Sequence, residues 1–378
     1  MSLVESLKND ERHEYVLFYE DPKFRKFCSD HQNFKLVCIP PDDNGISRIV
    51  GKLAALFGFR SLRSSRYRSI RENKIDILIN PASSSIGFRL GLPSIVVIHD
   101  LMHKYYPEFP EYSLKSRITR DLTFRRAAKH SVFTVVDSNQ GREDLVRFYK
   151  IDKRKIKVIP YCPASYSYNY KDLDEQYIAS VIDKYGIPDK FIFYPAQFWH
   201  HKNHSRLIES IYSLREQFNI KVQVVLVGAQ KKDSRDTLPA VTKQIERLKL
   251  QNQIFNLGYL PEKELVALYK KSIALVFPSL GGPTNIPILE AMVLGTPVLC
   301  SNLFSMPDQV GNAGLLFDPF SVKDMAEKIH RIWTDEDLRQ ACIQKGYERV
   351  KNATLENYAG RWEQVIEEAL NMEKRSVV

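Results

Sequence analysis

A short loop and the helix expected after it carry residues suited to an anionic ligand. Residues 281–286 are Gly-Gly-Pro-Thr-Asn-Ile, and Glu290 falls in what we expect to be the first turn of that helix. Backbone N–H groups at a helix start attract anions, and the helix dipole adds to the attraction. A carboxylate accepts hydrogen bonds from two hydroxyls, such as those of a ribose. The stretch fits a diphosphate cradle beside a ribose site, and ordinary turn and helix-start chemistry is the alternative.

A second group of candidate residues lies in the stretch Pro-Ala-Gln-Phe-Trp-His-His-Lys-Asn-His at 195–204. Lysine is a common phosphate ligand, so Lys202 at a helix start predicts a phosphate contact. An exposed lysine without a ligand is the alternative. The three histidines also permit a metal site, but no carboxylate lies nearby in the sequence, and we do not favour it.

A third candidate is His99, which follows the strand-like run Ser-Ile-Val-Val-Ile at 94–98. Polar residues at strand ends often take part in the chemistry of such proteins, although a core histidine bonded to the backbone is also possible. Asp-x-Asp pairs at 172–174 and 335–337 have the spacing of metal-dependent sugar transferases. We interpret both pairs as structural.

The elements that would position these residues alternate along the whole chain. Near-continuous apolar runs alternate with amphipathic segments, which predicts an α/β fold with parallel sheets covered on both faces. The expected strands are 14–20, 34–40, 75–81, 94–100, 131–137 and 156–161, then 191–197, 222–228, 253–259, 273–279, 297–302 and 313–319. Ligands of such sheets bind at the carboxyl ends of the strands.

The polar, tyrosine-rich stretch 165–190 has no strand pattern and is expected to connect two domains, with a short helix in it. We therefore expect an N-terminal Rossmann-like domain over 1–170 and a second over 171–355. A helix over 356–378 is expected to pack back toward the first domain.

The amino-acid composition indicates the broad class of protein. The chain has 378 residues, of which 44% are hydrophobic, and this is typical of soluble globular proteins. No apolar run approaches the roughly 20 residues of a transmembrane helix, and the charged N-terminus lacks the apolar core of a signal peptide. Five scattered cysteines indicate a reducing compartment rather than a disulfide framework or a zinc site.

The excess of basic residues lies in the first half of the chain. Residues 1–170 hold 29 Lys and Arg against 19 Asp and Glu, so they carry the whole formal charge of +10. The excess concentrates at 59–75 and 114–130. The apolar residues in the first of these segments are Leu62, Tyr67 and Ile70, and they interleave with Arg60, Arg63, Arg66, Arg68 and Arg71. This pattern suits anionic lipid headgroups; nucleic acid and a solvated face without a partner are alternatives.

Several motifs stand in a fixed order over 257–319: Pro-Ser at a strand end (278–279), a glycine loop, Leu-Glu-Ala-Met (289–292), Gly-Thr-Pro-Val (295–298) and Gly-Leu-Leu-Phe-Asp-Pro (314–319). The chain thereby resembles the family-4 retaining glycosyltransferases over roughly 94–350. The resemblance implies the GT-B fold, in which two Rossmann-like domains face each other across a cleft.

The resemblance also assigns roles. It implies that Glu290 holds the donor ribose, that Lys202 binds phosphate and that His99 lies near the transferred sugar. The remaining donor contacts are the nucleobase positions Tyr259 and Leu260 and the diphosphate and sugar positions Thr284, Asn285 and Ile286.

Three features depart from the family pattern. Gly282 stands where a glutamate is usual, Gln197 stands where an arginine is usual, and the chain opens on the helix-like residues 2–10 instead of a strand and a glycine-rich loop. A non-catalytic nucleotide-binding module or partner subunit is therefore the alternative to an enzyme. A nucleotide-sugar epimerase and an RNA- or DNA-binding protein are weaker alternatives, and we expect no nucleic-acid partner.

The resemblance implies transfer of a sugar, with retention, from a nucleotide-sugar to a hydroxyl of a lipid-linked or polysaccharide acceptor. Our first choice of donor is GDP-mannose, and the context is cell-surface glycan synthesis of the lipopolysaccharide, O-antigen or capsule type. The departing phosphate would act as base, so no protein nucleophile, metal ion or other cofactor is expected. The basic half would hold a cytoplasmic enzyme at the inner face of the membrane.

Overall fold

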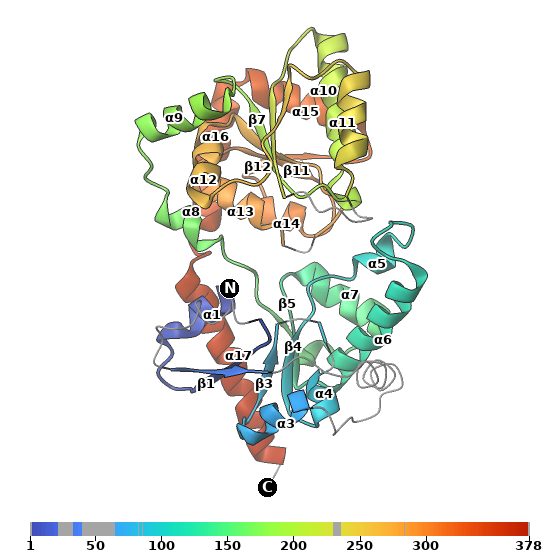
Figure 1. Ribbon diagram of the computed structural model, residues 1–378, viewed down its shortest axis with the longest axis vertical. Helices are drawn as coiled ribbons and strands as arrows, with labels where there is room; N and C mark the ends of the chain where they lie inside the picture. Colours follow the sequence, from blue (N-terminus) through green and yellow to red (C-terminus); the bar gives the residue numbers. More distant parts are fainter. Residues whose placement is uncertain are drawn as a thin grey trace. The chain divides into compact units, whose positions relative to one another are not determined.

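The computed structural model describes residues 2–21, 33–39, 65–81, 83–84, 86–229, 236–282 and 284–376. The chain divides into two compact units. Unit 1 comprises Met1–Pro107, Leu114–Pro160 and Leu355–Val378, and unit 2 comprises Glu108–Ser113 and Tyr161–Thr354. Both units are layered α/β structures with parallel strands, as expected (Figure 1).

Unit 1 contains two separate parallel sheets. The 2-stranded sheet pairs β1 (Tyr15–Tyr19) with β2 (Phe34–Cys38). The 4-stranded sheet has the order β3-β4-β5-β6, with strands Leu78–Asn80, Ser94–Val97, Phe133–Val136 and Ile156–Val158. The described helical segments of this unit are α1 (Ser2–Ser6), η1 (Leu7–Asn9), α3 (Ser65–Glu72), α4 (Ile86–Leu90), α5 (Met102–Tyr105), α6 (Leu114–His130), α7 (Asn139–Tyr149), η3 (Lys153–Lys155) and α17 (Leu355–Ser376).

The last helix described, α17, belongs to unit 1. It packs against α1, and its acidic residues Glu363 and Glu367 form ion pairs with Arg12. A third pair joins Lys157 at β6 to Glu368. Two stretches far apart in the sequence thus complete the same unit.

Unit 2 is built on a 6-stranded parallel sheet with the order β12-β11-β10-β7-β8-β9. Its strands are β7 (Ile192–Pro195), β8 (Val224–Val227), β9 (Ile254–Asn256), β10 (Ala274–Phe277), β11 (Val298–Ser301) and β12 (Gly314–Phe317). The four residues of β8, of β10 and of β11 are all buried, as expected of strands covered on both faces. Within unit 2 the chain forms β7 first and adds β8 and β9 on one side of it. It then returns to place β10, β11 and β12 on the other side of β7, so the strand order reverses between β7 and β10.

The described helices of unit 2 cover this sheet. They are α8 (Ser165–Asn169), α9 (Glu175–Tyr185), η4 (His200–Lys202), α10 (His204–Phe218), α11 (Leu238–Arg247), α12 (Glu262–Lys271), α13 (Ile286–Val293), α14 (Met306–Val310), α15 (Val322–Thr334) and α16 (Glu336–Val350). The strands of both units fall within the stretches that the apolar runs indicated.

The tyrosine-rich stretch 165–190 is folded onto unit 2 rather than being a bare connection. Two helices, α8 and α9, occupy most of it, and both pack against α12. Glu264 of α12 accepts hydrogen bonds from Lys184 Nζ (2.8 Å) and Tyr185 Oη (2.5 Å). The boundary between the units consequently lies after Pro160, whereas we expected it after residue 170.

Candidate functional site

The loops that follow β7 and β10 meet at the point where the strand order of unit 2 reverses. Leu280 N donates to His201 O at 2.7 Å. Asn203, in a left-handed conformation, donates from Nδ2 to Pro278 O (3.1 Å) and to Pro319 O (2.9 Å). One buried side chain therefore ties the turn after β7 to the carboxyl ends of β10 and β12. Ligands of doubly wound sheets bind at such a reversal point.

Lys202 lies on the η4 turn, immediately before α10. Its carbonyl accepts a hydrogen bond from Tyr194 Oη at 2.7 Å, which fixes the backbone of the turn. Its Nζ lies 5.1 Å from the centroid of the Phe277 ring at the end of β10, within the range of a cation–π contact. The lysine that the sequence singled out therefore lies at the carboxyl edge of the sheet, beside both loops.

The loop before α13 is held by side-chain amides. Asn285 N donates to Gln309 Oε1 (3.1 Å), and Gln309 Nε2 returns a bond to Asn285 O (2.8 Å). Asn285 Nδ2 also donates to Gly282 O at 3.2 Å. Gly282 has φ +127°, and a Cβ added there would lie 2.4 Å from Asn285 Oδ1. The positive φ therefore disfavours any residue with a Cβ at this position, including the glutamate that the family pattern places there, and the Asn285 side chain would have to move to admit it.

Glu290 lies in the second turn of α13, not in the first turn as we expected, because the helix begins at Ile286. The residue is 4% exposed. Oε1 accepts a hydrogen bond from Tyr166 Oη at 2.5 Å, and Oε2 accepts one from Tyr269 Oη at 2.8 Å. Burial raises the pKa of the carboxyl group, and the two tyrosine hydrogen bonds oppose that shift. Each oxygen keeps a second lone pair for a further donor.

Other predicted donor contacts differ in exposure. Tyr259 is 76% exposed and can stack on a flat ring, but Leu260 is 5% exposed and packs into the core of unit 2. Gln197 is half-buried, and its Oε1 has no hydrogen-bond partner among the described residues. Thr284 and Ile286 are also half-buried and flank Asn285 at the start of α13.

His99 lies in unit 1, two residues after the end of β4. It is exposed, and its Nε2 is 2.9 Å from Pro81 O, so it is not the core histidine of the alternative interpretation. The next residue, Asp100, accepts a hydrogen bond from Met102 N at 2.9 Å and so supports the start of α5. The His99 side chain is therefore exposed to solvent, whereas Asp100 has a local structural role.

The side chains of the histidines near Lys202 do not point toward one common position, as metal ligands would. His204 is buried, and its ring stacks on Phe198 with centroids 4.5 Å apart; burial lowers its pKa to about 3, which keeps it neutral. His201 Nδ1 instead lies 3.6 Å from Glu111 Oε1. Within the described ranges, no three His, Cys, Asp or Glu residues are grouped as metal ligands would be. In the two Asp-x-Asp pairs, Asp174 and Asp335 are N-caps of α9 and α16.

Sequence patterns missed four residues that shape this site. Tyr166 and Tyr269 hold Glu290, and Gln309 holds the 281–285 loop. Glu111, from the short segment of the first half that belongs to unit 2, accepts a hydrogen bond from His200 N at 3.1 Å. The density of tyrosines at 165–170 was the one available signal. Nothing in the sequence spacing brings Glu111 to the histidines.

The basic segment at 59–75 is only partly described. Arg60 and Arg63 lie outside the described residues, and Arg66 lies in α3 without a described side chain. Arg68 is exposed, whereas Arg71 donates from Nη2 to Leu90 O at 2.8 Å. Ile70, which we expected to face lipid between these arginines, is 2% exposed and packs in the core of unit 1. That part of the expected lipid-facing pattern is therefore wrong.

Comparison with known proteins identifies the family. The model of the group 1 glycosyl transferases matches residues 180–349, and the model of glycosyltransferase family 4 matches residues 9–162. This chain belongs to the group 1 and family 4 glycosyltransferases. The solved structure of HepE from Anabaena in complex with UDP and glucose superimposes with a TM-score of 0.74 at 16% identity, over 97% of this chain and 95% of that one. The fold is accordingly GT-B.

Two curated relatives are bacterial mannosyltransferases. The O-antigen chain mannosyltransferase B of Escherichia coli is 25% identical over 66% of this chain and 64% of its own length. The serotype-specific mannosyltransferase WbdA of Escherichia coli is 32% identical over 44% of this chain and 20% of its own length. The chain thus spans less than two thirds of either relative.

Proposed function

We propose that this chain is a glycosyltransferase that moves a sugar from a nucleotide-sugar, GDP-mannose being our first choice, to a hydroxyl of a lipid-linked or polysaccharide acceptor. The reaction proceeds with retention and without a metal ion, in O-antigen or related cell-surface glycan synthesis. Two relatives are named as mannosyltransferases, and the name of one refers to the O-antigen chain. The observation that carries the proposal is the arrangement of Lys202, the 281–285 loop and Glu290 around one edge of the unit 2 sheet.

The geometry supports binding of a nucleoside diphosphate. Glu290 offers one free lone pair on each oxygen to a ribose diol, while its other lone pairs are engaged by tyrosines. The start of α13 and the Lys202 ammonium both favour negative charge nearby. Tyr259 provides an exposed aromatic face for a base. HepE, whose fold this chain shares, was solved in complex with UDP and glucose, which fits a ligand of the same chemical class.

The same groups account for catalysis. As the glycosidic bond to the diphosphate breaks, charge develops on the leaving group. A donor placed in advance for such charge contributes about 3–4 kcal/mol in the transition state. Lys202 and the N–H groups near Asn285 would supply this stabilisation. The departing phosphate would accept the proton of the attacking hydroxyl on the same face of the sugar, so the product would retain its anomeric configuration.

One observation favours the alternative of a non-catalytic nucleotide-binding module or partner subunit. Gly282 stands where the family pattern has a glutamate, so the carboxylate near the donor sugar is missing, and the φ of +127° at this position disfavours a side chain. Gln197 likewise replaces a cation. Under this alternative the chain binds the nucleotide but transfers no sugar.

A membrane association of the enzyme is supported by α6. Leu114, Ile118 and Leu122 recur at every fourth position of this helix and are 65%, 50% and 38% exposed. The helix also carries the exposed cations Lys115, Arg125 and Lys129. The single acid of the helix, Asp121, is turned to Lys104 and to Tyr149 Oη, which is 2.8 Å away. Apolar side chains flanked by cations suit the headgroup region of an anionic leaflet.

No helix among the described residues is both long enough and apolar enough to cross a bilayer. The location that we propose is a peripheral one, at the cytoplasmic face of the membrane, with α6 as the contacting surface.

The test has two stages. Calorimetry of the purified chain with GDP-mannose and UDP-glucose, and with the matching diphosphates, establishes whether unit 2 binds a nucleotide and which base it prefers. Incubation with radiolabelled donor and membrane lipid extract then measures transfer. Binding with transfer supports the enzyme, and binding without transfer or donor hydrolysis supports the non-catalytic alternative. No binding of any donor would overturn both.

A further inference from the structure

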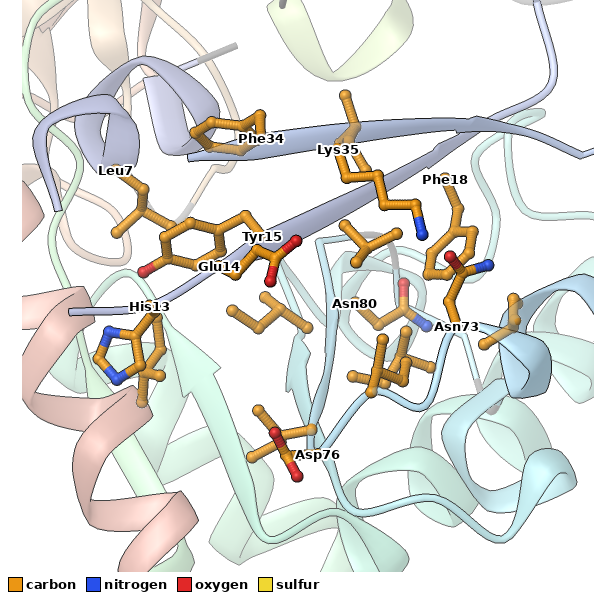
Figure 2. Close-up of a pocket in the computed structure, with 18 of the residues that line it drawn as sticks. Leu7, His13, Glu14, Tyr15, Phe18, Phe34, Lys35, Asn73, Asp76 and Asn80 are labelled. Atoms are coloured by element: carbon orange, nitrogen blue, oxygen red, sulfur yellow. The ribbon is translucent and has the colours of Figure 1, made fainter. Parts of the chain in front are cut away.

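The proposed function leaves two features of the first half of the chain unexplained, a cavity and a buried glutamate. The cavity, of about 670 Å³, lies in unit 1 and is lined by Tyr15, Lys35 and Asp76 among other residues (Figure 2). Charged and apolar side chains are mixed in its walls, and none of the residues assigned to the donor site lines it. The glutamate is Glu111, which contacts the turn that carries Lys202.

Glu111 lies in a loop whose two ends are held together. The loop joins α5 to α6, and Asp121 of α6 forms ion pairs with both His103 and Lys104 of α5. Its segment Glu108–Ser113 belongs to unit 2, although α5 before it and α6 after it belong to unit 1. Because its ends are already close, ordering this loop costs less entropy than ordering an open segment.

The sequence also restricts the conformation of this loop. Pro107 and Pro110 each fix φ at about −65°. Tyr112 N donates a hydrogen bond to Phe109 O at 2.8 Å, which closes a four-residue turn with Pro110 in its second position, where proline is favoured. Glu111 is the third residue of that turn, so a preformed turn determines where its side chain begins.

The Glu111 carboxylate caps the η4 turn from a distant part of the chain. Trp199, the residue before the turn, provides no side-chain cap. Glu111 Oε1 accepts a hydrogen bond from His200 N at 3.1 Å and lies 3.6 Å from His201 Nδ1. The first N–H groups of a helical turn have no partner within the turn, and a carboxylate oxygen satisfies one of them.

The backbone of η4 connects this cap to Lys202. Lys202 N donates to Trp199 O at 2.9 Å and so closes the turn around His200. Only one residue separates His200 from Lys202, and the hydrogen bond across the turn makes them move together. A change in the position of His200 therefore changes the direction in which the Lys202 ammonium points.

The stability of the fold does not explain the burial of Glu111. Only 7% of its side chain is exposed, and Oε2 is buried without a hydrogen-bond partner among the described residues. Burial raises the pKa of Glu111, the His201 side chain and the charges of His200 and His201 lower it, and the net shift is downward. A buried carboxylate with an unsatisfied oxygen costs free energy. Such a group, held against the donor turn, indicates a role in function.

We propose that Glu111 is a positioning residue of the donor site. Its carboxylate bonds to His200 N and thereby holds the η4 turn in the conformation that directs Lys202 at the diphosphate of the donor. Glu111 does not touch the nucleotide in this role. The inference rests on the proposed function, because Glu111 acts through the phosphate contact of Lys202.

The first experiment is a double-mutant cycle, measured by calorimetry with GDP and with UDP. Their affinities report the contact between Lys202 and a diphosphate, whether or not the chain transfers a sugar. Glu111→Ala is expected to weaken binding by about fivefold, as the loss of a helix cap would. In Lys202→Ala the same substitution is expected to have no further effect, because its action passes through the lysine. Equal losses in the two backgrounds would overturn the proposal.

Two further substitutions separate the hydrogen bond from the charge. Glu111→Gln keeps an acceptor oxygen at the same reach, and it is expected to recover most of the affinity lost in Glu111→Ala and to keep the thermal midpoint. Glu111→Asp keeps the charge but is one methylene shorter, and it is expected to bind as weakly as Glu111→Ala. The opposite order would show that the charge acts rather than the bond to His200 N, and would overturn the proposal. Glu108→Ala, at an exposed glutamate of the same segment, is the control and should match the wild type.

The outcomes for Lys202 distinguish a failure of this inference from a failure of the proposed function. If Lys202→Ala binds GDP and UDP as well as the wild type does, the phosphate contact is absent, and the proposed function fails together with this inference. If Lys202→Ala weakens binding and Glu111→Ala does not, the donor site stands and the positioning role of Glu111 is wrong.

Discussion

Tyr166 Oη donates a hydrogen bond to Glu290 Oε1 at 2.5 Å, and this bond joins α8 to α13 inside unit 2. The carboxylate is almost fully buried, and Tyr269 Oη supplies its second bond from α12. Burial raises the pKa of Glu290, the negative charge of Glu262 raises it further, and the two phenols counteract both. The two phenols therefore oppose the rise in the pKa of Glu290 without cancelling it.

The first prediction concerns the stability of Tyr166→Phe. A carboxyl group whose folded pKa is raised stabilises the fold below its unfolded pKa, and this stability is lost as pH rises through the folded pKa. Removing the phenol raises the folded pKa further. The difference in the free energy of unfolding between the variant and the wild type is therefore largest above that pKa and small at low pH. We expect a loss of about 1.5–3 kcal/mol at pH 8, and much less at pH 4. Urea unfolding at the two pH values measures it.

Tyr168→Phe is the matched control, because Tyr168 lies on the same helix and its Oη donates to a neutral group, Ala353 O, at 2.9 Å. That variant is expected to lose about 1 kcal/mol at both pH values. Equal losses at pH 4 and pH 8 in Tyr166→Phe would show that the phenol does not affect ionisation of Glu290.

The second prediction concerns Lys202→Ala. If the ammonium stabilises the leaving diphosphate, its removal lowers kcat by about 10²–10³-fold, and the loss in kcat exceeds any change in KM. Sugar transfer with saturating donor measures the effect. Lys243→Ala, an exposed lysine on α11, is the control and should match the wild type. Wild-type turnover in Lys202→Ala would show that this lysine does not stabilise the leaving diphosphate.

The third prediction concerns Glu290→Gln, which keeps the shape of the side chain and removes its charge. A ribose diol bonded to a carboxylate gains about 1.5–3 kcal/mol per charge-assisted bond. The wild type is therefore expected to prefer a nucleoside diphosphate over its 2′-deoxy form by about tenfold or more, and Glu290→Gln to lose most of that preference. Calorimetry with both nucleotides measures the ratio. A ratio unchanged by the substitution excludes ribose contact at this residue.

The fourth prediction concerns Gly282. The φ of +127° and the distance of 2.4 Å between Asn285 Oδ1 and an added Cβ both oppose any side chain. Gly282→Ala is expected to cost about 1–3 kcal/mol, and Gly282→Glu is expected to lower activity rather than to recreate a usual family residue. Gly360→Ala on α17, where an added Cβ meets nothing within 4 Å, is the control and should be neutral or slightly stabilising. A more active Gly282→Glu variant would contradict this account of the loop.

The fifth prediction concerns α6. Replacing Leu114, Ile118 and Leu122 together by glutamine should weaken binding to vesicles with anionic lipid by more than about tenfold without changing the thermal midpoint, because all three are exposed. Flotation assays measure it. Met372→Gln, at another exposed apolar residue of unit 1, is the control. If the triple variant floats as well as the wild type, α6 does not contact the membrane.

Much of the fold could be predicted from the sequence because parallel strands buried on both faces have an unambiguous apolar signature. The residues of β8, β10 and β11 are all buried, and each strand lies inside its expected run. Lys202 and the 281–285 loop were also predictable, since both follow strands whose carboxyl ends must share one edge of a sheet.

The features that could not be predicted depend on contacts between residues far apart in the sequence. The partners of Glu290 come from α8 and α12, and no local spacing relates Tyr166 or Tyr269 to a residue on α13. Ile70 stands between arginines in the sequence but faces the core, because a helix turns by about 100° per residue and neighbours in sequence point in different directions. The division of unit 1 into two sheets had no signature in the apolar runs.

The membership of α17 in unit 1 has a consequence for biosynthesis. The ribosome releases residues 355–376 after all of unit 2, yet Arg12 and Lys157 find their ion partners there, and Ile366 and Leu370 border the same cavity as β1. Unit 2, by contrast, has all of its residues once Thr354 has emerged. The part of the chain that is synthesised first therefore has its full set of contacts only after the part that is synthesised second is complete.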